Sequence, residues 1–359
     1  MTKTLQTEQA QPVADPAPDP PRRAYRGALR LVLATAGAFL VFAVFLLARG
    51  ADPLAVFASM ARSAAGNPRA IGETLIRTAP LLLAALAVAV PARAGLFNIG
   101  GEGQILMGAV GAAAAARLLS AATPRGLALL AMIAAGAAAG AALALAAGLL
   151  KVVARTNEAI TTLLLNYVAI LILTWLVFGP WKDPTSLGQA YSTPLDPGMR
   201  LPILWGSRVH AGILLALAAA PLVWAAMRFT RWGFTLRVLG GNPNAARRAG
   251  FAVGALTLSA MAAGGALAGV AGMLEVAGVE GRLRPGMMAG FGFIGFLASW
   301  LARHHPLRIV GAALLLAAVA VGGNGLKITA GLSGAAVNVL MALLLLGILG
   351  WGRTAAGRQ

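Results

Sequence analysis

The chain has 359 residues, of which 59% are hydrophobic and only 11% are charged, and its mean hydropathy is +0.79. A soluble globular domain carries about 25% charged residues, so this composition excludes an ordinary soluble protein and indicates an integral membrane protein. The formal net charge of +18 does not indicate a nucleic-acid partner, because the basic residues are scattered in loops between apolar runs. The sequence contains no cysteine, which excludes disulfides and cysteine-ligated zinc. Its histidines lack metal-ligand spacing, so we expect neither a metal nor a cofactor.

The N-terminal segment is polar and rich in proline, which predicts a disordered cytoplasmic tail over residues 1–28. A transmembrane helix takes about 20 predominantly apolar residues, and the rest of the chain offers many such runs. We predict an all-α membrane protein with about ten transmembrane helices in a transmembrane domain over 29–351, followed by a cytoplasmic tail over 352–359. The predicted spans are 29–48, 74–90, 104–119, 126–150, 159–178, 211–227, 251–272, 289–301, 309–321 and 334–351. Arginines before the first span place both termini in the cytoplasm.

Two glycine-rich breaks divide the chain in a similar way. RAGLFNIGGEGQILMGA follows the second predicted span, and VEGRLRPGMMAGFGFIGF follows the seventh. We therefore expect two pseudo-repeated five-helix halves, about 72–180 and 211–351, with broken helices near the middle. The glycine pairs Gly136 with Gly140 and Gly265 with Gly269 have the spacing of close helix contacts. Filler glycines in an alanine-rich chain would explain them equally well.

The first break combines flexible backbone with polar side chains at membrane depth. Its glycines are Gly95, Gly100, Gly101 and Gly103, and its polar side chains are Asn98, Glu102 and Gln104. Irregular backbone within a membrane is tolerated only where it is buried in protein or lines a watery cavity. We expect left-handed or strained glycines to open the helix here, so that the three polar side chains line the path of a neutral, hydroxyl-rich solute. Alternatively, Glu102 only caps the helix that starts near Gly103, or pairs with Arg93.

Other polar and aromatic residues are weaker candidates for the solute path. Asn166 lies one to two turns inside a span and needs a buried partner, while Phe291 and Phe293 offer rings for stacking. Asn157 and Glu158 begin that same span, where capping is the expected role. Further along, three roles stay open for Glu275 and Glu280: contact with a binding protein, gating of the pore, or no role beyond that of solvated loop charges.

The longest cytoplasmic loop is RWGFTLRVLGGNPNAARRAGF, residues 231–251. Asn242, Pro243 and Asn244 start a short helix there, which is either a docking element outside the membrane or an ordinary basic loop. Neither glycine-rich stretch carries the lysine and Ser/Thr of a Walker nucleotide loop. Any ATP hydrolysis therefore takes place on another chain.

Four stretches together resemble a known family: GLFNIGGEGQILMGA, NEAITTLLLNY, GGNPNAARRAGF and GRLRPGMMAGFGFIG. They are similar to signatures of the ABC importer permeases of the branched-chain amino acid and simple-sugar superfamily, closest to the nucleoside and simple-sugar subgroup. The resemblance implies that 240–250 is the coupling helix that contacts an ATPase. Its pattern residues are Gly241, Asn242, Ala245, Ala246, Arg247 and Gly250.

The same resemblance implies a set of partners and a location. An ABC ATPase subunit, a second permease in a homologous heterodimer, an extracytoplasmic substrate-binding protein and membrane lipid are expected, and nucleic acid is not. The chain would lie in a bacterial cytoplasmic membrane and carry nucleosides or related small neutral solutes inward by alternating access. A simple-sugar permease is the alternative within this family.

Two other classes of protein were weighed against the transport subunit. An ion-coupled secondary transporter with Glu102 as proton carrier explains a buried carboxylate and broken helices, but not the docking loop. An intramembrane enzyme needs paired carboxylates, a histidine pair or a nucleophile with its base. None is evident in the sequence, so we expect a subunit that is not an enzyme and has no catalytic residue.

Overall fold

The computed structural model describes residues 21–204, 207–287, 290–331 and 335–356. Within these ranges the regular structure is helical, and the only β-type pairings are two isolated bridges between single residues. The α-helices are α1 Pro21–Ala48, α2 Pro53–Ala65, α3 Pro68–Arg93, α4 Gly101–Leu118, α5 Arg125–Ala154, α6 Glu158–Phe178, α7 Gly212–Phe229, α8 Arg231–Gly241, α9 Pro243–Arg248, α10 Val253–Glu275, α11 Phe291–Leu301, α12 Pro306–Ala330 and α13 Ala335–Ala356. A short 3-10 turn, η1 Pro197–Met199, and a π-helical turn, η2 Val276–Glu280, complete the set.

The all-α membrane class predicted from the sequence is confirmed, and each of the ten predicted spans overlaps one α-helix. Among the described residues, six helices are long and apolar enough to cross a membrane, or seven if α1 and α2 count as one span bent by 118°. Helix α2 lies outside the ten predicted spans, and Asp52 caps it by accepting a hydrogen bond from the backbone of Leu54. Proline at the first position of α2 separates it from α1.

The expected boundaries of the tails shift by a few residues. Helix α1 begins at Pro21, inside the predicted N-terminal tail, and residues 1–20 lie outside the described part of the chain. Helix α13 continues to Ala356, and residues 357–359 of the predicted C-terminal tail lie outside it as well. Two predicted span starts, positions 289 and 334, also lie outside. The duplication of 72–180 and 211–351 stays a prediction.

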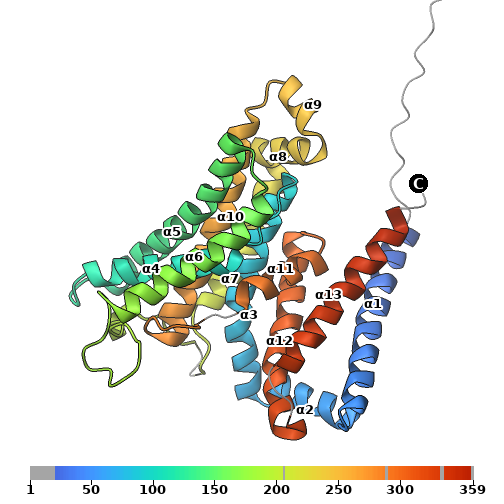
Figure 1. Ribbon diagram of the computed structural model, residues 1–359, viewed down its shortest axis with the longest axis horizontal. Coiled ribbons are helices and arrows are strands. Elements are labelled where there is room, and N and C mark those ends of the chain that lie inside the picture. The colour runs from blue at the N-terminus through green and yellow to red at the C-terminus, as the bar shows by residue number, and fades with distance from the viewer. Residues whose placement is uncertain (1–20, 205–206, 288–289, 332–334, 357–359) are drawn as a thin grey trace, which may run out of the picture.

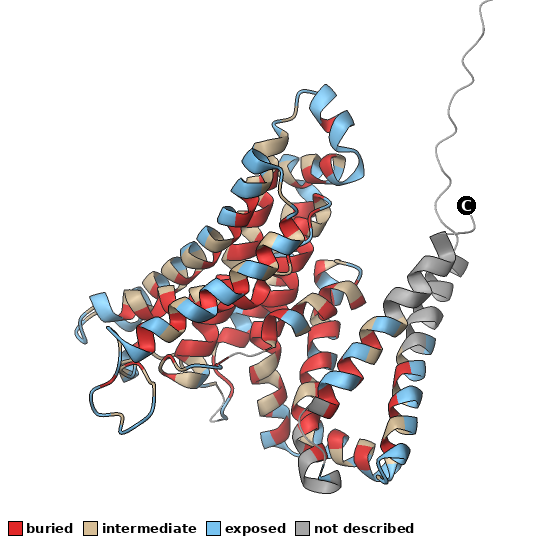
Figure 2. Ribbon diagram, in the orientation of Figure 1, coloured by how far each residue is buried: buried red, intermediate tan, exposed pale blue. Residues whose placement is uncertain are grey.

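Helix α3 lies at the centre of the bundle. In its most apolar stretch 83% of the residues are buried, against 28% in α5 and 33% in α6. Figure 2 shows this as a buried column through α3 and α10, with exposed faces on the outer helices. A helix that is hydrophobic on every side belongs in a protein core or a membrane. The apolar residues on the outer faces of α5 and α6, among them Leu149, Leu171 and Trp175, fit contact with lipid.

Glycines allow α10 to approach α5 and α4 closely. A Cβ at Gly140 would overlap the carbonyl oxygen of Gly265, and a Cβ at Gly269 would overlap that of Gly136. The predicted helix contacts are thus confirmed, because these glycines are not filler. Small residues let helix backbones meet where the solvent provides no hydrophobic driving force.

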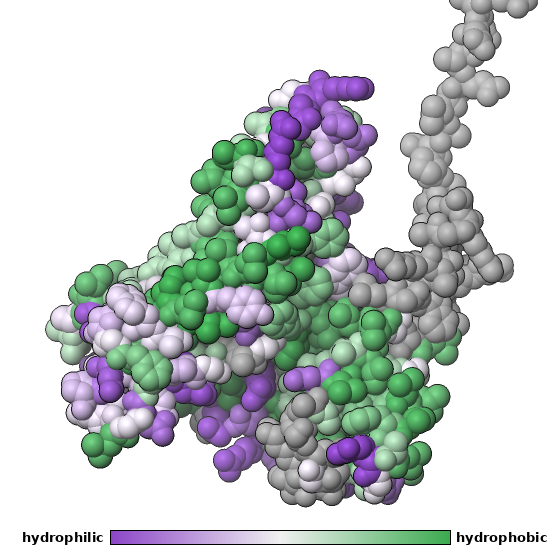
Figure 3. All heavy atoms as spheres, viewed as in Figure 1, coloured by the Kyte–Doolittle hydropathy of each residue, from purple (hydrophilic) through white to green (hydrophobic). Residues whose placement is uncertain are grey.

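The polar surface gathers at opposite ends of the molecule. Figure 3 shows hydrophilic residues over α8 and α9 at one end and over the loop between α6 and α7 at the other, with a hydrophobic belt between them. A bilayer requires such a division, because its apolar core is about 30 Å thick. We call the α8–α9 end the docking end and the other the loop end.

Candidate functional site

The first break, residues 94–100 between α3 and α4, is irregular backbone held in place by one face of α6. The hydroxyl of Thr162 accepts a hydrogen bond from the backbone N–H of Ile99, 3.2 Å away. Asn166 accepts one from the N–H of Gly103 at 2.8 Å and donates one to the carbonyl of Ile99 at 3.2 Å. Backbone polar groups buried without water need such partners. The side chains of α6 therefore supply the hydrogen-bond partners that an unbroken helix would have provided.

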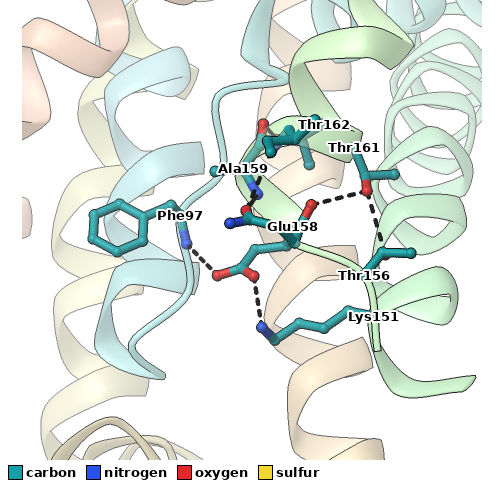
Figure 4. Close-up of polar contacts among 9 residues, drawn as sticks. Phe97, Lys151, Thr156, Glu158, Ala159, Thr161 and Thr162 are labelled. Carbon is teal, nitrogen blue, oxygen red and sulfur yellow. Dashed lines mark hydrogen bonds and ion pairs between the residues drawn. The ribbon is translucent and has the colours of Figure 1, made fainter. Parts of the chain in front are cut away.

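Glu158, the first residue of α6, extends this face by one turn (Figure 4). One carboxylate oxygen accepts a hydrogen bond from the backbone N–H of Phe97 at 3.2 Å, and the other pairs with the ammonium of Lys151 at 2.6 Å. The same close-up shows Lys151 reaching back from the end of α5. Glu158 therefore joins α5, α6 and the first break, whereas Asn157 performs the expected capping of α6.

Asn98 and Gln104 pair with each other inside the break. The amide nitrogen of Asn98 donates to the oxygen of Gln104 at 2.9 Å, and the amide nitrogen of Gln104 donates to the oxygen of Asn98 at 2.8 Å. Asn98 also accepts from the N–H of Gly100 at 3.1 Å. Both side chains are buried. In this conformation the two amides stabilise the break from within.

Glu102 joins the two breaks. Its two carboxylate oxygens accept hydrogen bonds from the backbone N–H groups of Gly290 and Gly292, at 2.6 and 2.7 Å. These N–H groups lie at the start of α11, so Glu102, in the first turn of α4, caps a helix far away in the sequence. Neither capping of its own helix nor pairing with Arg93, the two alternatives to a lining role, describes this contact, because the carboxylate caps α11; the lining role stays a prediction. Carboxylates are favourable at helix N-termini because the unpaired N–H groups there carry partial positive charge.

The glycines of the first break differ in part from the predicted conformation. Among these four only Gly95 has a positive φ, of 72°, so left-handed backbone, one of the two conformations expected at Gly100, Gly101 and Gly103, is absent there; that they open the helix for a solute path stays a prediction. Gly100 and Gly103 are small because neighbours come close. A Cβ at Gly103 would lie 2.9 Å from the Cα of Asn166, and one at Gly100 would lie 2.9 Å from the Cβ of Thr162, whereas a Cβ at Gly101 would make only an ordinary contact, 3.4 Å from the Cα of Gly292.

The second break, between α10 and α11, is held by the loop that links α6 to α7. The backbone of Ser192 donates to the carbonyl of Leu283 at 2.9 Å, and its hydroxyl accepts from the N–H of Leu283 at 2.8 Å. Arg200 of this loop donates to the carbonyl of Val279 at 2.9 Å. The loop is therefore part of the bundle at the loop end, and its sequence carries no pattern that predicts this pairing.

The predicted docking element consists of α8 and α9, which protrude at the docking end of the bundle (Figure 1). Asn242 caps α9 by accepting from the N–H groups of Asn244 and Ala245, so the predicted helix start is confirmed. Ala246 is 0% exposed and packs against the chain's own apolar cluster. The other residues of the predicted pattern are exposed, namely Gly241, Asn242, Ala245, Arg247 and Gly250.

Backbone contact links this element to the first break. The left-handed Gly95 lies so close to α8 that a Cβ there would be 3.4 Å from the Cα of Gly240. In the opposite direction, a Cβ at Gly240 would overlap the carbonyl oxygen of Arg93 and lie 3.0 Å from the nitrogen of Gly95. Helix α8 therefore lies directly against the start of the first break, three residues before Asn98.

Aromatic side chains cover the break on its docking side. Phe97 stacks on Trp300 of α11, with ring centroids 6.2 Å apart and 12° between the planes, and His304 meets the edge of Trp300 at 4.8 Å. Burial, and secondarily the nearby Arg93, lowers the pKa of His304 to about 4. His304 is therefore neutral at physiological pH, and the cluster ties the end of α11 to the first break without a cation of its own.

The structure brings most of the predicted path residues into one region, but it buries their polar groups. Asn98, Glu102, Gln104 and Asn166 hold the breaks through paired hydrogen bonds, whereas Phe291 is buried and Phe293 is 50% exposed. The sequence analysis missed Thr162 and the long-range bond of Glu158. Their spacing at positions 158, 162 and 166 is a signal that was available, because residues four apart share one face of a helix.

The helical bundle with two linked breaks and a protruding helical element is that of a multi-pass membrane protein, and the comparisons with known proteins show its class. The model of the family "Branched-chain amino acid transport system / permease component" matches residues 70–349. The chain belongs to this family of ABC transporter permeases, and it is a transport component, not an enzyme.

Three relatives show how widely this similarity extends. The glucose ABC transporter permease protein TsgB13 of Haloferax volcanii is 34% identical over 88% of this chain and 85% of its own. The guanosine ABC transporter permease protein NupP of Bacillus subtilis is 30% identical over 85% of this chain and 88% of its own. The nucleoside ABC transporter permease protein NupB of Lactococcus lactis is 30% identical over 80% and 81%.

The bridge by Glu102 predicts an unusual sensitivity to a nearly isosteric change. In Glu102→Gln one acceptor oxygen becomes an NH2 group that meets a backbone N–H, so one donor at the start of α11 loses its partner. A hydrogen bond to a charged group contributes about 1.5–3 kcal/mol. We expect the thermal unfolding temperature of the purified permease to fall clearly, whereas Glu73→Gln, which removes an exposed pair with Arg208, leaves it nearly unchanged. Equal unfolding temperatures for the two variants would contradict the bridge.

The contact between α8 and the first break predicts opposite results for two adjacent glycines. Gly240→Ala places a methyl group against the Arg93 carbonyl, whereas the space around a Cβ at Gly241 is open. Gly240→Ala should lower the thermal stability of the permease without its partners. Gly241→Ala should leave the thermal stability unchanged or raise it slightly, because alanine stabilises a helix by about 0.5–1 kcal/mol relative to glycine. Scanning calorimetry or a fluorescence melt in detergent provides the comparison, and a stable Gly240→Ala protein would exclude the contact.

Proposed function

We propose that this permease imports nucleosides or related small neutral solutes, by alternating access driven by a separate ATPase. The observation that best supports this proposal is the direct contact between the exposed α8–α9 element and the first break, through Gly240 and Gly95. A partner bound at α9 has in this contact a short mechanical route to the segment that caps α11. The proposed complex also includes a second, homologous permease and an extracytoplasmic binding protein in a bacterial cytoplasmic membrane, with both termini of this chain in the cytoplasm.

The arrangement of the charges supports a neutral solute and a separate energy source. Glu102 accepts hydrogen bonds from two backbone N–H groups, so a proton-carrier role would require it to release the start of α11 in every cycle. The ion-coupled alternative is less well supported for this reason. A simple-sugar permease stays the alternative within the family, because one relative is named for glucose and others for guanosine and nucleosides.

Uptake into proteoliposomes tests this function. Vesicles that contain the permease with its ATPase and binding protein should accumulate labelled guanosine only when ATP is supplied on the ATPase side. Labelled glucose should not accumulate under the same conditions. Uptake by this chain alone in a proton gradient would overturn the proposal, and ATP-driven uptake of glucose without guanosine would favour the sugar alternative.

Substitutions at two adjacent alanines distinguish docking to the ATPase from folding of the permease itself. Ala245 is exposed on α9, whereas Ala246 is fully buried against the chain's own core. We expect Ala245→Glu to leave the isolated permease as stable as the wild type but to abolish co-purification with the ATPase. Ala246→Glu should destabilise the isolated permease itself, because it buries a charge without a partner. Normal ATPase co-purification and ATP-coupled uptake in Ala245→Glu would exclude α9 as the docking helix.

A further inference from the structure

A buried carboxylate at the end of α10 has no place in the site described above. Glu275 is only 7% exposed, and its carboxylate makes no hydrogen bond with any residue in the described part of the chain. It immediately precedes the π-helical turn Val276–Glu280, and such turns occur frequently at functional sites. An ionisable side chain inside a membrane span is costly and marks a functional site by default.

Arg77 of α3 is the cation that remains available to this carboxylate. The charged groups within electrostatic range of Glu275 are Arg77, Glu280 and Arg284. Arg284 is already occupied, because it donates two hydrogen bonds to Glu280, at 2.8 and 2.7 Å. Among the described residues Arg77 and Glu275 form no direct ion pair. Helix α10, which carries Glu275, packs against α3, which carries Arg77, so a buried acceptor and a donor with unused hydrogen-bonding capacity lie on neighbouring helices.

Phe291 provides an aromatic ring beside this pair. The guanidinium carbon of Arg77 lies 6.0 Å from the centre of the Phe291 ring. Phe291 is the first residue of α11 and lies between the two glycines whose N–H groups Glu102 holds, so the bridge fixes the position of the ring. From Arg77 to Arg93 helix α3 rises about 24 Å, at about 1.5 Å per residue. The three side chains therefore lie toward the loop end, opposite the proposed docking surface.

We propose that Arg77, Glu275 and Phe291 recognise the base of the transported nucleoside. The guanidinium donates to an acceptor on the edge of the base, the carboxylate accepts from an adjacent N–H, and the Phe291 ring packs against the face of the base. The two charges cancel, so the site suits an uncharged solute, and a nucleobase offers both a π-face and adjacent donors and acceptors. This inference rests on the proposed function and names the part of the solute that is read.

Neutralising variants in the whole transporter test the assignment. In proteoliposomes with the ATPase and binding protein, Arg77→Gln and Glu275→Gln should each lower the rate of guanosine uptake at saturating solute by about tenfold or more, as expected for the loss of one hydrogen bond to a charged group. ATP hydrolysis without solute should be unchanged. Glu73→Gln is the matched control, because Glu73 lies one turn from Arg77 on α3 and pairs with Arg208 in the exposed region.

The double variant Arg77→Gln with Glu275→Gln separates recognition from a structural role. If the two residues only neutralise each other, removing both charges leaves no unpaired charge and should restore uptake. If they read the base, the double variant should insert normally, keep the wild-type melting temperature and remain as slow as the single variants. The double variant also decides the matter if a single variant fails to insert.

The outcomes distinguish this inference from the proposed function. A wild-type complex that takes up no nucleoside overturns both. A wild-type complex that transports guanosine, together with a double variant that transports it at the same rate, overturns the recognition site alone. Phe291→Leu adds a check on the ring: it should slow guanosine uptake without lowering ATP hydrolysis, and wild-type uptake in this variant would remove Phe291 from the site.

Discussion

The fold depends on a single carboxylate placed between two helix N-termini. The first turns of α4 and α11 meet so closely that a Cβ at Gly292 would overlap the backbone of Glu102. Each N-terminus carries about half a positive elementary charge from its unpaired N–H groups, and two such ends in a medium of low dielectric constant would repel each other. Glu102 supplies one carboxylate to both, as part of the first turn of α4 and as the acceptor for Gly290 and Gly292. The two breaks, almost two hundred residues apart, are therefore one structural unit.

The supports of this unit come from different sides of the bundle. On the docking side, α6 holds the first break through Glu158, Thr162 and Asn166, and α8 touches it at Gly95. On the loop side, the segment between α6 and α7 holds the second break through Ser192 and Arg200. Each support makes its bonds mainly to backbone atoms, so the breaks are fixed without using up every side chain near them. Within the described part of the chain, the side chains of Arg77 and Glu275 are left without a structural hydrogen bond.

The sequence was sufficient for the helices and for the existence of both breaks, because apolar length and glycine content are local properties. It was also sufficient for the start of α9, where Asn242 and Pro243 form a recognisable cap. It could not place Glu102, since the partners of its carboxylate follow in the sequence by 188 and 190 residues and are backbone groups that look alike at every position. The conformation of Gly100 and Gly103 could not be read from the sequence for the same reason: close approach of a distant element and left-handed backbone both require glycine. Helix α2 lies outside the predicted spans because a 13-residue helix is too short for a span.

Burial of the amides changes which residues can respond to a solute. Asn98 and Gln104 already satisfy each other's donors and acceptors, so a solute that bonded to either would have to break a pair that is shielded from water. Breaking such a pair costs about 1–3 kcal/mol for each group left unsatisfied, and the hydrogen bonds to the solute would have to offset that free energy. Glu275 has no such bond to lose. A polar solute therefore gains more hydrogen-bond free energy from the unpaired groups near α11 than from the paired amides of the first break. The polar residues with the strongest sequence signal are better suited to holding the structure than to recognising the solute.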